Sequence, residues 1–257
     1  FENVQHIITQ RPNEPKLRNS MAYILNWAQN YNNLDTRKEL IDIIDQFYEK
    51  TKEGVEISSE NASNMLLDGD VVLTHCHSSL VEKALIKAHE KGTKLTVFCT
   101  ETRPRYQGRI TAKNLWDAGL DVTMIVDSDT CDVLKKADHF LTGADVVLAD
   151  GSVINKVGTH AISVVASHYK VPHTVITTTH ICEPLLFNNL KRTVEQRDVK
   201  EVWEDKPDSL KIRNPAFDVV PNNLIEKFIT EEGIFTPETL YFWINKANTK
   251  NLIKKIF

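Results

Sequence analysis

Short apolar runs alternate with helical segments between residues 70 and 177, and this alternation limits the fold more than any other feature of the sequence. Five runs have the length and apolar content of buried strands: 71–74, 95–99, 121–126, 139–141 and 173–177. Between them, apolar residues recur at helical spacing, for example in 111–118 and 161–169. Strands that alternate with helices are joined by right-handed crossovers and form a parallel sheet with helices on both faces. The sequence therefore predicts an α/β fold with a Rossmann-like parallel sheet.

The first quarter of the chain has a different pattern, because its apolar residues follow a helical period only. A broad apolar stripe runs along one expected helix: Leu40, Ile41, Ile43, Ile44 and Phe47. Lys52-Glu53-Gly54 is expected to interrupt this helix, and 57–67 predicts a further one. We expect a helical N-terminal domain over residues 1–66 and a Rossmann-like domain over residues 67–257. Within the second domain, the polar segment 183–213 is expected to be a surface excursion.

Composition and charge exclude several classes of function. The formal net charge is −4 and no broad basic face is indicated, so we expect no direct contact with nucleic acid. No apolar run approaches the length of a membrane span. The four cysteines, Cys76, Cys99, Cys131 and Cys182, have neither metal-ligand spacing nor the pattern of a disulfide framework. These features favour a cytoplasmic protein with reduced thiols and no bound metal.

The stretch 143–159 (GADVVLADGSVINKVGT) combines an acid with a candidate anion site. Asp145 follows an expected central strand, and ligands of open α/β sheets bind at the carboxyl ends of the strands. Asp150-Gly151 predicts a hairpin turn. Asn155 and Lys156 precede Gly158 and a helix, and a helix N-terminus beside a lysine is a natural anion site. The stretch therefore indicates a phosphorylated substrate.

Five segments in order resemble motifs of the initiation-factor-2B-like family. They are 74–79 (THCHSS), 100–108 (TETRPRYQG), 143–145 (GAD), 155–159 (NKVGT) and 214–218 (NPAFD). That family contains the regulatory alpha, beta and delta subunits of translation initiation factor 2B. It also contains methylthioribose 1-phosphate isomerase and archaeal ribose 1,5-bisphosphate isomerase. The resemblance implies a helical N-terminal domain on a Rossmann-like C-terminal domain, in agreement with the pattern of apolar residues.

The resemblance implies that a Cys/Asp pair separates the enzymes of the family from the regulatory subunits, and here the pair is Cys76 and Asp145. The isomerases move a proton between C2 and C1 of an aldose 1-phosphate, which implies Cys76 as the base and Asp145 as the acid. The position of Cys76 just before a helix predicts a lowered thiol pKa. Cysteine is, however, also a common small buried hydrophobe. The flanking His75 and His77 are candidates for tuning the thiol.

The resemblance also implies a set of substrate-binding residues. Asn155 and Lys156 correspond to the pair that holds a substrate hydroxyl and a phosphate, and Gln107 corresponds to a substrate contact. Arg18 is assigned to a substrate phosphate. Arg103 either contacts the substrate or pairs with an acidic residue, and both readings stay open.

Two departures from the isomerase pattern concern phosphate binding. An Arg-Gly-Ala type segment of the isomerases corresponds here to 16–21 (KLRNSM), which lacks the glycine and is closer to the delta-type subunits. Ile181 stands where the ribose bisphosphate enzyme has a phosphate-binding lysine. The loss of one charge-assisted phosphate contact costs roughly 1.5–3 kcal/mol. The binding of a bisphosphate is therefore in question.

Two functions are consistent with the sequence. The first is a sugar-phosphate aldose–ketose isomerase, without metal or organic cofactor, that acts on a pentose 1-phosphate such as ribose 1,5-bisphosphate. The second is a non-catalytic regulatory subunit that binds a sugar phosphate or a nucleotide, or that docks onto the alpha subunit of translation initiation factor 2. In either case the resemblance implies a homo-oligomer that associates through the C-terminal domain.

Overall fold

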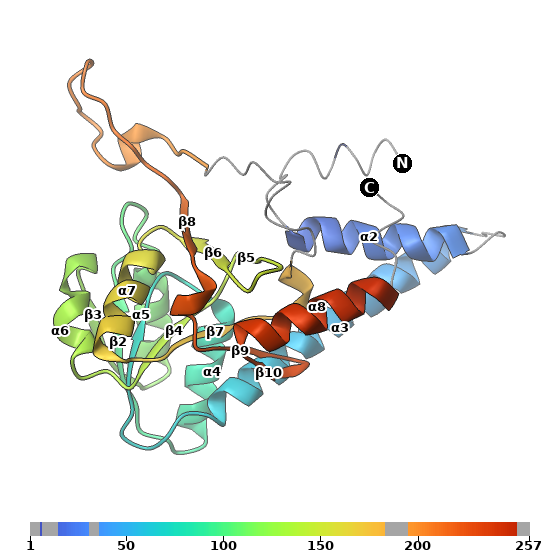
Figure 1. The fold of residues 1–257 in the computed structure, drawn as a ribbon, viewed down its shortest axis with the longest axis horizontal. Helices are drawn as coiled ribbons and strands as arrows, with labels where there is room; N and C mark the ends of the chain where they lie inside the picture. The colour runs from blue at the N-terminus through green and yellow to red at the C-terminus, as the bar shows by residue number, and fades with distance from the viewer. Residues whose placement is uncertain (1–5, 7–14, 31–35, 183–194, 251–257) are drawn as a thin grey trace.

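The computed structural model describes residues 6, 15–30, 36–182 and 195–250, and its centre is a seven-stranded sheet (Figure 1). The strand order is β10-β9-β7-β4-β1-β2-β3, and only β10 runs antiparallel to its neighbour in this sheet. The strands are β1 (Val71–Thr74), β2 (Thr96–Thr100), β3 (Asp121–Ile125), β4 (His139–Thr142), β7 (His173–Ile176), β9 (Lys227–Thr230) and β10 (Gly233–Phe235). The α/β fold with a mainly parallel sheet, predicted from the alternating pattern, is confirmed.

The order of the strands creates a switch point between β1 and β4. From β1 the chain proceeds to β2 and β3 on one side, and then crosses to β4, β7 and β9 on the other. In open α/β sheets such a point leaves a crevice outside the carboxyl ends of the strands, where ligands bind. The loops after β1 and β4 border this crevice.

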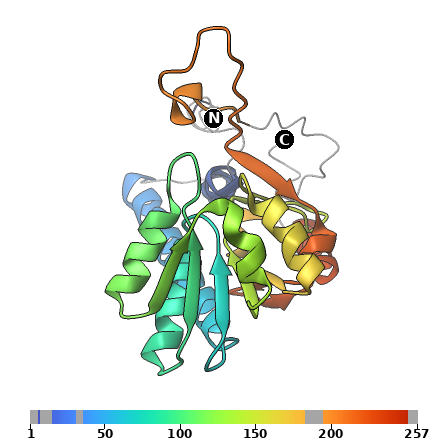
Figure 2. The ribbon, with the colours of Figure 1, turned by 90° about the vertical axis from the view of Figure 1, so that its left-hand side faces the viewer.

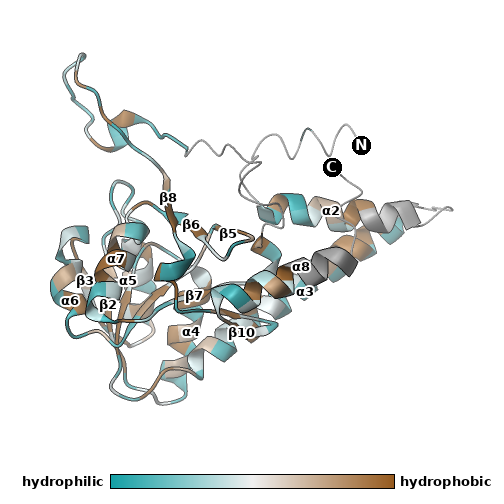
Figure 3. Ribbon diagram, in the orientation of Figure 1, coloured by the Kyte–Doolittle hydropathy of each residue, from teal (hydrophilic) through white to brown (hydrophobic). Residues whose placement is uncertain are grey.

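Helices cover both faces of the sheet, as Figure 2 shows. The helices are α2 (Pro15–Asn30), α3 (Thr36–Ser63), α4 (Ser79–Glu90), α5 (Gly108–Asp117), α6 (Thr130–Leu134), α7 (Thr159–Tyr169) and α8 (Pro237–Lys250). Val72 packs in the core formed with α3, α4 and α5, whereas the next residue, Leu73, packs in the core formed with α6 and α7. Successive strand residues point to opposite faces, so both faces are apolar and both need a helical cover. Brown, hydrophobic segments accordingly lie on the strands and inner helices in Figure 3.

A second, three-stranded antiparallel sheet lies beside the first, in the order β5-β6-β8. Its strands are β5 (Val146–Val147), β6 (Val153–Lys156) and β8 (Phe217–Val220). The predicted turn at Asp150-Gly151 is confirmed, because the Gly151 N–H donates to the Leu148 carbonyl at 2.9 Å and Gly151 has a φ of 81°. The pairing of β6 with β8 was not predicted, since it joins segments about 60 residues apart.

Helix α3 is continuous through Gly54, so the predicted interruption at residues 52–54 is wrong. Gly54 is buried, and a Cβ at this position would lie 3.6 Å from the Cγ atom of Glu231. The helix is held from outside by ion pairs with α4, such as Lys87–Glu56 at 3.0 Å and Lys91–Glu60 at 2.5 Å. Tertiary packing therefore outweighs the cost of about 1 kcal/mol for glycine inside a helix.

The segment 195–216 forms an arm that projects from the body (Figures 1 and 2) and is mostly hydrophilic in Figure 3. The arm closes on itself where the Arg197 N–H donates to the Asn214 carbonyl at 2.8 Å. This part of the chain has the irregular structure expected of a surface excursion, whereas residues 183–194 of that prediction lie outside the described residues. None of the described helices combines the length and apolarity that a membrane crossing needs.

Candidate functional site

Cys76 and Asp145 follow adjacent strands at the switch point of the sheet. Cys76 lies two residues after β1 and Asp145 three residues after β4, and Thr74 pairs with Leu141 between these strands. The two loops touch, because a Cβ on Gly143 would lie 2.5 Å from the Ser78 Oγ atom, which leaves room for glycine only. The two loops that the sequence marked as chemical motifs therefore meet at one edge.

The thiol of Cys76 lies within the electrostatic range of both Asp145 and Lys156. Lys156 lowers the pKa of the Cys76 thiol, whereas the charge of Asp145 raises it. Cys76 is 9% exposed, whereas Asp145 is exposed. Asp145 and Lys156 thus both act electrostatically on Cys76, and these three residues form one group whose acid, base and phosphate-binding roles stay predictions.

The predicted lowering of the Cys76 pKa is wrong. Burial raises the pKa of the thiol to about 11, and it outweighs the lowering by the neighbouring backbone N–H of His77 and by Lys156. Helix α4 begins at Ser79 with Ser78 as its N-cap, so Cys76 lies outside the first turn, where the helix dipole acts most strongly. The thiol is therefore protonated at neutral pH.

Lys156 is a buried cation at the end of β6. It is 7% exposed, and its Nζ atom lies 4.9 Å from the centroid of the Phe217 ring. Within the described ranges, no carboxylate lies within ion-pair distance of this ammonium group. A buried charge is costly without a partner, and the aromatic face compensates only in part. The residue is therefore suited to binding an anionic ligand.

The N-terminus of α7 does not provide the predicted anion site, because the protein itself fills it. The carboxylate of Asp218, on β8, accepts hydrogen bonds from the backbone N–H groups of Gly158 at 2.8 Å and His160 at 3.2 Å. Burial raises the pKa of Asp218, and these two bonds oppose the rise. An anionic ligand in this region is left with Lys156 rather than with the helix terminus.

Three of the other expected binding residues, Asn155, Gln107 and Arg103, lie in different places. Asn155 is buried beside Lys156, and its Nδ2 donates to the Thr159 hydroxyl at 3.1 Å. Gln107 is the residue before α5, and its side chain makes no capping bond. Arg103 directs its guanidinium to the Tyr106 hydroxyl and to the Val202 carbonyl of the arm, at 3.1 Å for the latter. These contacts favour a structural role for Arg103, although no acidic residue is its partner in them.

Arg18 and Ile181 belong to the contact between α2 and the loop after β7. Arg18 is buried in α2, and the neighbouring Asn19 donates its Nδ2 to the His180 carbonyl at 2.6 Å. Ile181 is 9% exposed and packs in an apolar cluster with Val147 and Phe228. The position that carries a phosphate-binding lysine in the ribose bisphosphate enzyme, as the resemblance implies, is here part of a core.

Three polar residues that the sequence analysis left without a role lie directly behind Cys76. The Cys76 N–H donates to the Thr102 hydroxyl at 3.0 Å, and the Thr102 and Thr100 hydroxyls lie 3.2 Å apart. Asp127 accepts the backbone N–H groups of Thr102 and Arg103, both at 2.7 Å. Asp127 follows β3 at the same edge of the sheet. Its place just after an expected strand is the sequence feature that could have identified it as a site residue.

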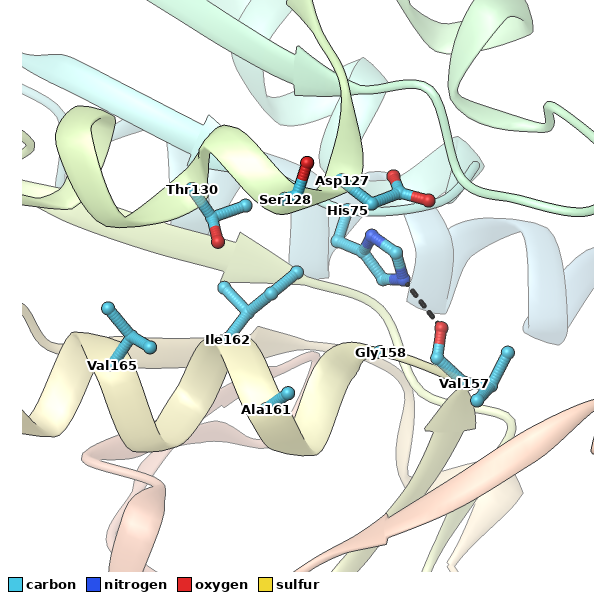
Figure 4. A pocket seen from close by; sticks show the side chains of 9 residues that line it. All are labelled: His75, Asp127, Ser128, Thr130, Val157, Gly158, Ala161, Ile162 and Val165. Carbon is cyan, nitrogen blue, oxygen red and sulfur yellow. Dashed lines mark hydrogen bonds between the residues drawn. The ribbon is translucent and has the colours of Figure 1, made fainter.

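A cavity of about 420 Å³ lies beside this group and is shown in Figure 4. Its lining consists of His75, Asp127, Ser128, Thr130, Val157, Gly158, Ala161, Ile162 and Val165. The lining does not include Cys76, Asp145 or Lys156. It does include His75 and Val157, which are the sequence neighbours of Cys76 and Lys156 and are hydrogen-bonded to each other. Across the described part of the chain, no cluster of three His, Cys, Asp or Glu side chains is arranged to hold a metal ion.

Comparison with known proteins agrees with the motifs. The family model described as the initiation factor 2 subunit family matches residues 2–237. The ribose 1,5-bisphosphate isomerase of Methanocaldococcus jannaschii is 37% identical over 242 residues, which are 93% of this chain and 78% of that protein. The methylthioribose-1-phosphate isomerase of Desulforamulus reducens is 32% identical over 246 residues, which are 88% of this chain and 71% of that protein.

Solved structures give the same answer for the fold. The translation initiation factor eIF-2B of Pyrococcus horikoshii OT3 superposes with a TM-score of 0.80 at 26% identity, over 92% of this chain and 81% of that one. Because the family model covers most of the chain and the relatives exceed 30% identity over most of their length, this chain belongs to the initiation factor 2 subunit family.

Proposed function

We propose that the protein is a sugar-phosphate aldose–ketose isomerase that acts on a pentose 1-phosphate, of which ribose 1,5-bisphosphate is the first candidate. The observation that carries the proposal is the convergence of Cys76, Asp145 and a buried Lys156 without an acidic partner among the described residues. Relatives that share a third or more of their residues with this chain are named as isomerases of such sugars.

The proposed reaction moves one proton and leaves the phosphate in place. Asp145 protonates the ring oxygen as the bond between C1 and that oxygen breaks, which opens the sugar. Cys76 removes the proton on C2, so that a C1–C2 double bond forms. Asp145, now ionised, takes the proton of the C2 hydroxyl while Cys76 delivers its proton to C1, which gives the ketose with C2 oxidised and C1 reduced and restores both residues. Lys156 and Asn155 hold the phosphate and a hydroxyl of the substrate.

The protonated thiol defines how Cys76 acts as a base. With its pKa at about 11, only about one thiol in ten thousand is ionised at pH 7, and the thiolate that forms is a strong base. A thiolate with a protonated Asp145 and a thiol with an ionised Asp145 carry the same number of protons, so the pH profile of kcat/KM has the same shape for both assignments. In both cases kcat/KM is expected to fall near pH 11, where the thiol of the free enzyme loses its proton. A fall near pH 11 in the wild type that is absent in Cys76→Ser therefore shows that Cys76 takes part in the proton transfer.

The test of the proposal is proton exchange at C2 and ketose formation with a panel of pentose 1-phosphates and 1,5-bisphosphates. Cys76→Ser and Asp145→Asn are expected to lower kcat/KM by about 10²–10⁴-fold, because each removes a general acid or base. Cys131→Ser is the matched control, since Cys131 is an exposed thiol outside this group, and it is expected to keep the wild-type rate. No turnover with any sugar of the panel, or full activity of Cys76→Ser, contradicts the proposal.

A non-catalytic regulatory subunit is the second candidate, and the packing of Ile181 in the apolar cluster favours it. A bisphosphate loses one cationic contact there, whereas a sensor of a monophosphate or a nucleotide needs only Lys156. Calorimetric titration with pentose phosphates and nucleotides, and a pull-down with the alpha subunit of translation initiation factor 2, test this function. Turnover without any such partner excludes it.

The assembly and the location follow from the same proposal. We propose a cytoplasmic homo-oligomer that associates through the C-terminal domain, as the family resemblance implies. Light scattering of the purified protein measures the mass of the assembly. A monomer at micromolar concentration contradicts this part of the proposal.

A further inference from the structure

A continuous chain of hydrogen bonds runs from the backbone of Cys76 to the loop that carries Lys156. Its links are Cys76 N–H to Thr102 Oγ1 at 3.0 Å, Thr102 Oγ1 to Thr100 Oγ1 at 3.2 Å, Thr100 Oγ1 to His75 Nδ1 at 2.7 Å and His75 Nε2 to the Val157 carbonyl at 3.0 Å. Figure 4 shows the last of these links. Val157 lies between Lys156 and Gly158, so the chain joins the two loops that hold the thiol and the ammonium group.

The two ends of the chain determine the direction of every bond in it. The Val157 carbonyl can only accept, so His75 carries its proton on Nε2 and its Nδ1 accepts from the Thr100 hydroxyl. Thr100 then accepts from Thr102, whose hydroxyl accepts the N–H of Cys76. Burial lowers the pKa of His75, which is consistent with the neutral ring that this arrangement requires. The Thr102 hydroxyl also lies 3.4 Å from the Thr100 carbonyl, which is a second and longer acceptor for its proton.

The chain holds two residues in a backbone conformation that side chains rarely adopt. Cys76 has a φ of 69° and Thr102 a φ of 62°, and the hydrogen bond between them joins the two. A β-branched residue such as threonine is a clear outlier in the left-handed region, and such strain persists only where the surroundings impose it. Asp127 supplies part of that constraint, because its carboxylate binds the N–H groups of Thr102 and Arg103.

We propose that His75, Thr100 and Thr102 are positioning residues, which form a hydrogen-bonded relay that holds the Cys76 backbone in place relative to the Lys156 loop. The inference deepens the proposed function and rests on it for its kinetic part. The relay touches neither the substrate nor the reacting atoms, and it acts through the position of the thiol. A displacement of about 1 Å at a reacting group can lower a rate about 10²-fold.

The sharpest test is the pair Thr100→Val and Thr100→Ser. Valine has the shape of threonine without the hydroxyl, so Thr100→Val breaks the relay at its centre, whereas serine keeps the hydroxyl. Thr100→Val is expected to lower kcat about 10–100-fold with KM changed less than about threefold. Thr100→Ser is expected to restore kcat to within about fivefold of the wild type.

A matched control exists on the same sheet. Thr174 is fully buried on β7, and its hydroxyl has no hydrogen-bond partner in the part of the chain that the structure describes. Thr174→Val therefore makes the same change in a buried strand without breaking a relay, and it is expected to leave kcat unchanged. Equal kcat values for Thr100→Val and Thr174→Val, or equal losses for Thr100→Val and Thr100→Ser, overturn the inference.

Hydrogen exchange separates this inference from the proposed function. In Thr100→Val the amides of residues 74–80 are expected to exchange at least about fivefold faster than in Thr174→Val, because the acceptor of the Cys76 N–H loses its support. This measurement needs no substrate. If the wild type turns over no sugar phosphate but the exchange differs, only the proposed function fails. If the exchange is the same in both variants, the relay itself is wrong.

Discussion

Two histidines, His75 and His173, are buried to the same extent, and each is about 2% exposed. Burial lowers the pKa of both, to about 3 for His173. Both ring nitrogens of each residue have hydrogen-bond partners, so neither ring leaves a buried polar atom unsatisfied. The two residues are therefore alike in their burial, in their neutral charge and in having a hydrogen-bond partner for each ring nitrogen.

Their partners differ. His173 Nε2 lies 2.8 Å from the Thr142 hydroxyl of β4, and its Nδ1 lies 3.0 Å from the Ser163 hydroxyl of α7. Its ring also stacks on Phe140, with centroids 4.5 Å apart. All of these contacts join regular elements inside the core, whereas those of His75 join the end of β2, at Thr100, to the loop at Val157 at the edge of the sheet. The same chemistry stabilises the fold at one histidine and positions the thiol at the other.

The largest effect that this comparison predicts is on stability. His173→Leu removes two hydrogen bonds and leaves the Thr142 hydroxyl buried, so the free energy of unfolding is expected to fall by about 2–4 kcal/mol. Because the hydrogen bonds of His173 go to Thr142 and Ser163 and not to the relay, kcat of the folded variant is expected to stay within about threefold of the wild type. Urea unfolding and steady-state kinetics on the same sample measure both. A large loss of kcat without a loss of stability breaks the comparison.

His75→Leu is expected to give the opposite result. It removes the last two links of the relay, and kcat is expected to fall about 30-fold or more, which corresponds to about 2 kcal/mol in the activation free energy. The free energy of unfolding is expected to change by less than for His173→Leu, because the Val157 carbonyl lies in a loop and the Thr100 hydroxyl keeps Thr102 as a partner. If the two variants lose stability and activity in the same proportion, the two histidines do not have separate roles.

The pH dependence of stability is expected to show what the histidines share. Each is neutral in the folded state, with a pKa below the unfolded value of about 6.5. Above pH 6.5 both states are neutral. As pH falls below 6.5 the unfolded state binds the proton first, so stability is lost until the folded pKa is reached. From pH 7 to pH 5 the loss is about 2 kcal/mol for His173, whose pKa of about 3 lies below this range, and His75 contributes in the same direction.

His173→Phe tests this contribution, because phenylalanine keeps the ring but does not titrate. Urea unfolding at both pH values is expected to show a drop that is smaller by about 2 kcal/mol than in the wild type. An equal drop in the two proteins means that His173 is not neutral and buried as the structure has it.

Gly158→Ala tests the contact between His75 and the Lys156 loop. Gly158 has a φ of 104°, and a Cβ there would lie 3.1 Å from the His75 Nε2 atom. Gly92 is the matched control, because its φ is 94° and no atom lies within 4 Å of a Cβ built on it. Both alanine variants are expected to lose about 1–2 kcal/mol of stability through backbone strain, but only Gly158→Ala is expected to lower kcat. Equal kcat values argue against a constraint at His75.

The smallest effect is expected for Thr174→Val. Its hydroxyl is buried without a partner among the described residues, so the substitution is expected to raise the free energy of unfolding by up to about 1 kcal/mol. Thermal denaturation of the variant measures the change. A loss of stability instead indicates an ordered water molecule or a partner for this hydroxyl.

The sequence was sufficient for the fold because the fold depends on local patterns. Runs such as 71–74 and 139–141 have the length of buried strands, and a helix between successive strands forces the parallel arrangement. Gly54 shows the limit of this reasoning, because a glycine that breaks an isolated helix is tolerated where Glu231 packs against it. The pairing of β6 with β8 depends on residues far apart in the chain, and no local pattern contained it.

In the candidate site, too, some features follow from the sequence alone and others only from the tertiary structure. By itself the sequence determined which chemical groups are present, namely a thiol, a carboxylate, a lysine and their glycine-bearing loops, and that the loops lie at one edge of a parallel sheet. Only the tertiary structure decided their state. It buried Cys76 and raised its pKa, placed Asp218 on the helix terminus expected for the ligand, and joined Cys76 to the Lys156 loop through His75. The physical reason is that pKa values and hydrogen-bond partners depend on burial and on neighbours from distant segments, which no local period encodes.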